Sequence, residues 1–162
     1  RLASALPTQS SGGIVHGDYR LDNCILDEEG RIVAVLDWEM ATLGDPLADV
    51  GLLMMYWADP GASGGLAAPG IASTVTILPG FPTREQAAAR YAQRSGRDLS
   101  NLDFYTVLAH FKLTVILENM HARYLAGGTV GTGFEVIGQH ALLLAQRGLD
   151  IANKSSVAAL RG

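Results

Sequence analysis

The sequence predicts an α+β fold that is mostly helical and carries one small β-hairpin. Two short β-rich runs, Asn23–Leu26 and Arg31–Leu36, are separated by a polar segment that ends in glycine. Later segments repeat apolar residues at three- and four-residue spacing, which is typical of amphipathic helices. Of the 162 residues, 48% are hydrophobic and 17% are charged, so the chain is globular and long enough for one buried core.

The turn of the hairpin falls at Asp27–Gly30, where polar residues lead into a glycine. The second predicted strand is apolar on both faces, because the run Ile32–Leu36 contains no polar side chain. Strands of this kind are usually covered on both sides. We therefore expect an internal hairpin, preceded by a short apolar pair at Ile14 and Val15.

The boundaries of the helices are indicated by caps and glycines. Asp45 before Pro46 is a helix-start pair, because the carboxylate accepts hydrogen bonds from free helix N–H groups and proline lacks an N–H that would have no partner. Thr83 and Gln86 have the spacing of a capping box. The segment 58–70 is rich in Gly and Pro and predicts a surface loop. The predicted helices extend from Asp45 to about Trp57, from Thr83 to about Gly96, from about Phe104 to Gly127 and from about Phe134 to Leu149.

The third of these helices is predicted to be the central core helix. One set of apolar residues recurs along it at helical spacing, namely Phe104, Leu108, Phe111, Val115 and Ile116.

Charge and cysteine content narrow the classes of partner. The 12 Lys and Arg against 16 Asp and Glu give a net charge of −4, and without a basic run we expect neither a nucleic-acid nor a membrane partner. The longest apolar run, Val50–Ala58, is far shorter than the roughly 20 residues that span a bilayer. The single cysteine, Cys24, excludes an internal disulfide, so we expect a cytoplasmic protein. Because the charge disfavours nucleic acid and membrane, the expected partner is a small molecule.

The residues that carry chemistry lie in His16–Asn23 and Asp37–Glu39, at loop and strand ends. Asp18 and Asn23, across a tight loop, can direct one oxygen toward a nucleophile and another toward a hard cation. Asp37, on the adjacent hairpin, would complete a metal site. Taken singly, these residues have an ordinary alternative role, since Asp and Asn favour turns by bonding to nearby backbone. Their combination favours the catalytic hypothesis.

These motifs carry a specific resemblance. His-Gly-Asp at 16–18, Asp-Trp-Glu at 37–39 and Gly-Asp-Pro-Leu-Ala-Asp at 44–49 resemble the aminoglycoside phosphotransferase and choline kinase-like family, which has a protein-kinase-like fold. Phe-Pro-Thr-Arg-Glu at 81–85, Ser-Gly-Arg-Asp at 95–98 and Ala-Arg-Tyr at 122–124 resemble the subgroup associated with acyl-CoA dehydrogenases. The resemblance implies a mostly helical C-terminal lobe over residues 14–162, whose hairpin carries the catalytic site.

The resemblance also implies an activity, namely transfer of the ATP γ-phosphoryl group to a substrate hydroxyl with Mg²⁺ as cofactor. Asp18 would be the catalytic base, and Asn23 and Asp37 would bind the metal and, through it, the nucleotide. Asp49 would give structural support by bracing the catalytic loop. Apart from the resemblance, we expect His16 to be a packed, hydrogen-bonded support, as histidines in such positions commonly are. Arg20 and Asp22 are expected to contact either substrate or each other, and Glu39 is a further candidate metal ligand.

Complete members of this family have an N-terminal ATP-binding lobe with a strand lysine that pairs with phosphate. The lysines here, Lys112 and Lys154, both lie downstream of the catalytic motifs. We therefore expect residues 1–13 to be a linker or truncated connection, the N-terminal lobe to be a missing partner, and the isolated chain to be inactive. Self-association into a homodimer is a further expectation, because an absent lobe would leave apolar surface exposed.

A competing hypothesis is a non-catalytic binding module that keeps the kinase fold and recognises a small ligand such as an acyl-CoA. Retention of Asp18, Asn23 and Asp37 together favours the kinase, because a binding module needs no metal ligands. The identity of the acceptor is left open by the sequence. Aminoglycosides and hydroxyacyl compounds are the alternatives that the resemblance suggests.

Overall fold

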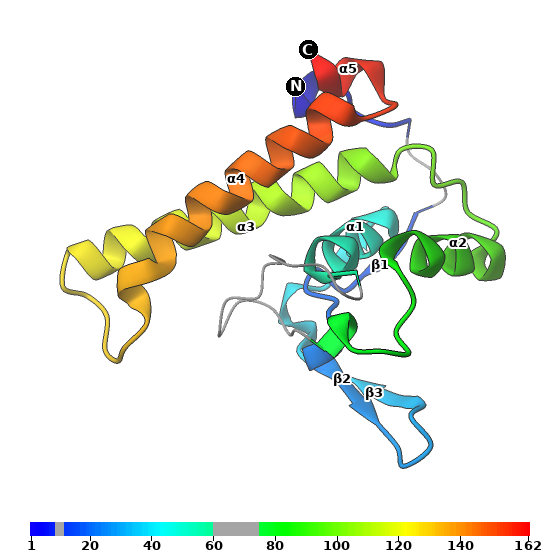
Figure 1. Ribbon diagram of the computed structural model, residues 1–162, viewed down its shortest axis with the longest axis horizontal. Helices are drawn as coiled ribbons and strands as arrows, with labels where there is room; N and C mark the ends of the chain where they lie inside the picture. The colour runs from blue at the N-terminus through cyan, green and yellow to red at the C-terminus, as the bar shows by residue number, and fades with distance from the viewer. Residues whose placement is uncertain (9–11, 60–74) are drawn as a thin grey trace.

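The computed structural model describes residues 1–8, 12–59 and 75–162, and it confirms the mostly helical α+β class. Helices α3 and α4 lie side by side and antiparallel along the longest dimension of the molecule, and α1 packs against the first half of α3 (Figure 1). The helices are α1 (Leu47–Tyr56), α2 (Arg84–Ser95), α3 (Leu102–Leu125), α4 (Ile137–Lys154) and the short α5 (Ala158–Arg161).

The core lies where α1 crosses α3 and where α3 meets α4. Gly51 of α1 lies directly on the backbone of Tyr105 in α3, so closely that an added Cβ would be 2.5 Å from the Tyr105 carbonyl carbon. Leu144 of α4 is completely buried in a cluster with Leu52 and Leu117. The three helices thereby form the buried body of the described fold.

The predicted start signals of α1 and α2 are confirmed. The Asp45 carboxylate accepts a hydrogen bond from the backbone N–H of Leu47 at 2.9 Å. Thr83 and Gln86 form the reciprocal capping box, in which each side chain accepts from the other residue's backbone N–H. Helix α2 ends at Gly96 with φ 68°, a left-handed conformation that glycine adopts at no steric cost.

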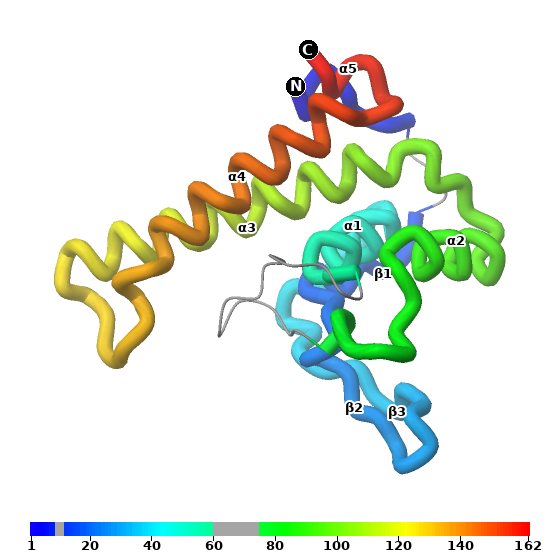
Figure 2. Tube along the Cα trace, viewed as in Figure 1, coloured from blue at the N-terminus to red at the C-terminus, as the bar shows by residue number. Residues whose placement is uncertain are grey.

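Helix α3 is central, as predicted, but its apolar stripe is only partly buried. Phe104 is 4% exposed, whereas Phe111 is 58% and Val115 is 43% exposed. In the described part of the chain, the second half of α3 extends beyond α1 and lies alongside α4 (Figure 2) and the 3-10 turn Phe134–Val136, so much of its remaining surface is exposed. Helix α4 continues to Lys154 rather than ending at Leu149, because its backbone first becomes extended at residue 155.

Two small antiparallel sheets precede and flank α1. Strands β2 (Cys24–Leu26) and β3 (Ile32–Val35) form the predicted hairpin. The strand β1 (Gly13–Val15) pairs with β4 (Thr42–Gly44), in a register that places Ile14 opposite Leu43. This second pairing was not predicted, and it brings the chain before His16 next to the chain that enters α1.

The expectation that the hairpin is internal is wrong for the described chain. Val33 is 60% and Leu26 is 57% exposed. The hairpin projects from the helical body, with β2 and β3 packed mainly on each other (Figure 1). A strand that is apolar on both faces is suited to being covered, but its sequence does not fix which part of a protein covers it.

Other expectations concern the segments between these elements. Of the predicted loop 58–70, residues 60–70 lie outside the described residues. Within the segment expected to be a linker, Leu2–Ser4 forms a 3-10 turn and Ala5 is buried, while residues 9–11 are outside the described part. Arg1 donates a hydrogen bond to the side chain of Asn153 at 2.7 Å. None of the helices described in the structure has the length and apolar character that a bilayer span requires.

Candidate active site

The loop that follows β1 is fixed by the carboxylate of Asp49 in the first turn of α1. Asp49 accepts hydrogen bonds from two consecutive backbone N–H groups, that of His16 at 2.6 Å and that of Gly17 at 2.8 Å. Hydrogen bonds to an ionised carboxylate are stronger than those between neutral groups. The structure therefore places Asp49 where a brace of this loop would have to lie.

His16 is 3% exposed and both ring nitrogens have partners. Its Nδ1 accepts from the backbone N–H of Asp18 at 3.2 Å, and its Nε2 lies 2.8 Å from the backbone oxygen of Leu36. Because Nδ1 is an acceptor, the ring carries its proton on Nε2 and donates it to Leu36. The ring of Trp38 lies against the imidazole with the ring centroids 4.6 Å apart.

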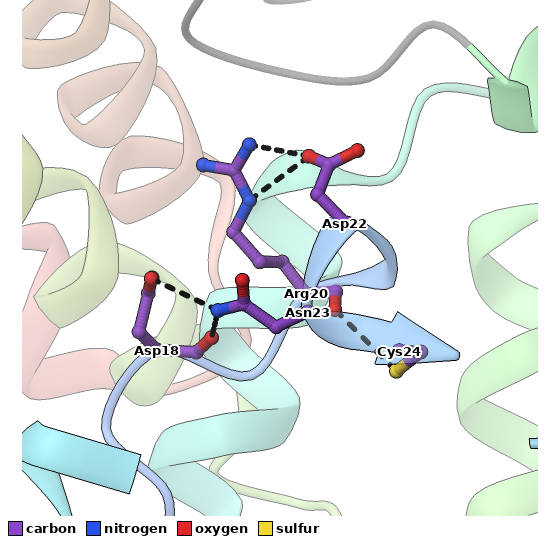
Figure 3. A network of polar contacts seen from close by, with 5 residues as sticks. All are labelled: Asp18, Arg20, Asp22, Asn23 and Cys24. Carbon is purple, nitrogen blue, oxygen red and sulfur yellow. Dashed lines mark hydrogen bonds and ion pairs between the residues drawn. The ribbon is translucent and has the colours of Figure 1, made fainter. Parts of the chain in front are cut away.

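Asn23 ends a 3-10 turn, Leu21–Asn23, and points back at Asp18 (Figure 3). Its Nδ2 donates to the Asp18 backbone oxygen at 2.8 Å and to the Asp18 carboxylate at 3.2 Å. The amide oxygen of Asn23 consequently points away from Asp18 (Figure 3). This orientation keeps the oxygen available for a cation, while the amide nitrogen holds the half-buried carboxylate of Asp18.

Asp37 is joined to the same loop through its neighbour. The backbone N–H of Leu36 donates to the Asn23 carbonyl at 2.8 Å, and the Leu36 carbonyl accepts from His16. Asp37 follows with φ 65°, the only non-glycine residue with positive φ among the described residues. Such a conformation is costly for most side chains, and residues that adopt it are frequent at functional sites. The Asp37 side chain is exposed.

The donor set of this site fits a magnesium ion that arrives with a nucleotide. Within the described ranges, no three His, Cys, Asp or Glu side chains form a group that could hold a metal ion. Asn23 and Asp37 instead offer an amide oxygen and a carboxylate, both hard oxygen donors. Mg²⁺ is usually held by one or two carboxylates together with substrate phosphates and waters. A small oxygen donor set of this kind is compatible with that arrangement.

Arg20 and Asp22 contact each other by a side-chain ion pair (Figure 3). The Arg20 guanidinium also lies over the ring of Tyr56, 4.8 Å from its centroid. Burial is the largest single effect on Arg20 and lowers its pKa, but the hydrogen bond that Arg20 donates to Asp22 and its interactions with the Tyr56 and Asp22 side chains together raise the pKa of the guanidinium. Burial raises the pKa of the Tyr56 hydroxyl, although the charge of Arg20 opposes this. The loop that contains Asp18 and Asn23 thus also carries a paired cation.

Glu39 does not extend a strand from Asp37. Glu39 lies exposed in the 3-10 turn Trp38–Met40. Side chains two residues apart share a face only in an extended strand, so strand geometry does not place Glu39 on the same side as Asp37.

One contact at this loop was not foreseen from the sequence. Lys112 of α3 donates from Nζ to the carbonyl oxygen of Gly17 at 2.7 Å. The only signal in the sequence was that lysine is rare, occurring at 112 and 154 alone.

Comparison with known proteins gives concordant similarities. The model of the phosphotransferase enzyme family matches residues 1–105. Acyl-CoA dehydrogenase family member 11 of Rattus norvegicus is 32% identical over 145 residues, which are 88% of this chain and 18% of that protein. Acyl-CoA dehydrogenase family member 10 of Mus musculus is 33% identical over 151 residues, 92% of this chain and 14% of that protein. The chain thus spans less than a fifth of these curated relatives.

A solved structure is similar over most of the chain. It is a crystal structure from Ralstonia eutropha JMP134, provisionally described as an aminoglycoside phosphotransferase. It is 34% identical with a TM-score of 0.74, over 90% of this chain and 44% of that one. Together, these similarities confirm both resemblances that the motifs predicted.

Proposed function

This chain belongs to the phosphotransferase enzyme family, and on that premise we propose that it carries the catalytic loop of a small-molecule kinase. The reaction would transfer the ATP γ-phosphoryl group to a substrate hydroxyl. The observation that carries the proposal is the set of hydrogen bonds through His16 and Leu36, which ties the segments of Asp18, Asn23 and Asp37 together. Ordinary turn chemistry would require no such link between a loop and a separate strand end.

Asp18 is the proposed general base. Its carboxylate would accept the hydroxyl proton as the substrate oxygen attacks the γ-phosphorus and the bond to the bridging oxygen of ADP breaks. The hydrogen bond from Asn23 limits the rotation of this carboxylate. General-base assistance is typically worth about 10² to 10⁴ in rate, so Asp18→Asn should retain a small residual activity.

Asn23 and Asp37 are the proposed ligands of Mg²⁺. The bound ion would neutralise negative charge on the nucleotide phosphates. The exposed side chain of Asp37 and the outward amide oxygen of Asn23 support this role. Loss of Asp37 should reduce activity more than loss of Asp18, because charge neutralisation supports both binding and transfer.

The deciding experiment is calorimetric titration of ATP into the complete protein that contains this chain, with Mg²⁺ and with EDTA. We expect Asp37→Asn to weaken ATP binding by about tenfold or more in Mg²⁺ and to leave binding in EDTA unchanged. Glu28→Gln, which removes the same charge from the exposed hairpin turn, is the matched control. Magnesium-independent ATP binding in the wild-type protein would contradict the kinase proposal and favour the binding module.

The nucleotide-covering part of the site is proposed to come from sequence outside this chain. The greater length of the relatives supports this. So does the position of both lysines, on the helices α3 and α4 rather than on a strand. We therefore expect the 162-residue chain alone to show no phosphotransfer, and robust transfer by the purified chain would contradict this division of the site.

The proposed acceptor is a hydroxyl on an acyl compound rather than an aminoglycoside. The names of the similar proteins support this choice of acceptor, because they are acyl-CoA dehydrogenase family members. A panel of hydroxyacyl-CoA compounds and aminoglycosides, assayed for ADP release by the complete protein, tests it. Turnover with aminoglycosides alone would overturn the choice of acceptor while leaving the kinase proposal intact.

A further inference from the structure

We propose that Lys112 is a positioning residue for the catalytic loop, acting on Asp18 through the peptide bond that precedes it. The inference rests on the proposed function of Asp18 as the base. Lys112 itself is not assigned any contact with substrate.

The peptide unit between Gly17 and Asp18 is held at both of its polar ends. Lys112 Nζ donates to the Gly17 carbonyl oxygen at 2.7 Å, and the Asp18 N–H donates to His16 Nδ1 at 3.2 Å. A peptide unit is planar, so fixing its oxygen and its N–H fixes the orientation of the whole plane. That plane fixes the N–Cα bond of Asp18, and with it the Cα atom from which the side chain extends.

Gly17 is also confined on its remaining sides. Its own N–H donates to Asp49 at 2.8 Å, and its φ is +86°, a conformation that favours glycine. A Cβ at this position would lie 2.6 Å from the backbone oxygen of Met40. The loop is therefore clamped between α1, α3 and the turn after Asp37, and Lys112 is the contribution of α3.

The surroundings of Lys112 suit a fixed hydrogen bond rather than a mobile surface charge. Lys112 is half-buried, whereas Lys154 is exposed. Lys112 and Asp49 line one cavity of about 200 Å³, whose other walls are mainly apolar and include Leu52 and Leu108. Hydrogen bonds to charged groups gain strength where the local dielectric is low. Lys112 on α3 thus holds the carbonyl oxygen of Gly17, and Asp49 on α1 holds its backbone N–H.

The test compares Lys112→Met, Lys112→Arg and Lys112→Gln, with Lys154→Met as the matched control, in the complete protein. Amide hydrogen exchange at Gly17 and Asp18 reports the clamp, and ADP release from Mg·ATP in the presence of the acceptor that the panel identifies reports catalysis. For Lys112→Met we expect kcat to fall about 10- to 100-fold with KM for ATP nearly unchanged, together with faster exchange at both amides. Lys112→Arg, which can still donate to the carbonyl, should restore most of both.

The outcomes separate this inference from the proposed function. Wild-type kcat and wild-type exchange in Lys112→Met would overturn the positioning role. If Lys112→Met does not fold, Lys112→Gln, one atom too short to make the same bond, must show the same loss of kcat for the inference to stand. If the wild-type protein releases no ADP from Mg·ATP with any acceptor of the panel, the proposed function fails, and the role of Lys112 in catalysis fails with it. In that case faster amide exchange in the variant would still identify the clamp as structural.

Discussion

The Nε2 of His16 lies 2.8 Å from the backbone oxygen of Leu36, and this hydrogen bond joins the loop of Asp18 to the strand end that precedes Asp37. The opposite side of the same ring accepts from the Asp18 N–H. One buried imidazole therefore sets the spacing between the proposed base and a proposed metal ligand. The hydrogen bonds of the two ring nitrogens can be tested separately, because the amide of Asn can replace Nδ1 and the amide of Gln can replace Nε2.

Replacing His16 by Asn or Gln should separate the two links. Asn places a polar atom near the position of Nδ1 and cannot reach Leu36, whereas Gln places its amide nitrogen near the position of Nε2. We expect His16→Asn to weaken Mg·ATP binding by about tenfold, and His16→Gln to weaken it less, because one lost hydrogen bond is worth about 0.5 to 1.5 kcal/mol. Calorimetry on the complete protein measures both. Equal affinities in the two variants would mean that the link to Leu36 does not position Asp37.

Asp49→Asn should destabilise the fold as well as the loop. The amide has one acceptor oxygen, so it cannot accept from His16 and Gly17 through two oxygens as the carboxylate does. We expect a loss of about 1 to 3 kcal/mol in the free energy of unfolding, measured by urea denaturation. Asp150→Asn, on the exposed side of α4, is the control for the charge and should change stability by less than about 0.5 kcal/mol. Equal effects of the two substitutions would argue against a bracing role for Asp49.

The features that the sequence predicted well are those encoded within a few residues. The capping box is one such feature, because Thr83 and Gln86 hydrogen-bond to each other's backbone N–H groups. The hairpin turn is another, because Asp27 accepts hydrogen bonds from the backbone N–H groups of Glu29 and Arg31. The pairing of Ile14 with Leu43 could not be predicted this way. Pairing of two short strands depends on tertiary packing, and neither strand shows a periodic pattern long enough to identify it.

The candidate site likewise contains some residues that the sequence predicted and some contacts that it did not. Asp18, Asn23 and Asp37 were selected from sequence by residue type and spacing, and their chemical roles stay predictions. The contact between Lys112 and Gly17 could not be foreseen, because the residues are 95 positions apart and the crossing of α1 and α3 decides which face of α3 meets the loop. The left-handed backbone of Asp37 was also hidden, since aspartate is compatible with several turn conformations.

Gly51→Ala should destabilise the crossing of α1 and α3. Alanine is a better helix former than glycine by about 1 kcal/mol, but its Cβ would lie 2.5 Å from the backbone of Tyr105, which cannot rotate away. We expect a net loss of about 1 to 3 kcal/mol, as for other overpacked cores. Gly148→Ala, whose Cβ would lie 3.1 Å from His110 Cβ, should cost less. Urea denaturation compares the two, and a Gly51→Ala protein as stable as the wild type would show that the helices separate easily.

Acid should destabilise the fold through His110. Burial lowers the pKa of this histidine, and the charges of Arg84 and Arg147 lower it further, although the hydrogen bond from its Nδ1 to the Thr106 carbonyl opposes both. Above about pH 6.5, the ordinary value, the ring is neutral in the folded and unfolded chains, and the free energy of unfolding does not depend on it. As the pH falls below that value, the unfolded chain binds the proton more readily, and stability decreases until the folded pKa is reached.

The measurement is urea denaturation between pH 8 and pH 5 of the wild type and of His110→Asn, which keeps a donor near the position of Nδ1. One linked proton gives a slope of at most about 1.4 kcal/mol per pH unit. We expect the difference in stability between wild type and variant to be constant above about pH 7 and to shift in favour of the variant below about pH 6.5. Other titrating groups are common to both proteins and cancel in this difference. Parallel curves over the whole range would mean that His110 accepts a proton as easily in the folded chain as in the unfolded one.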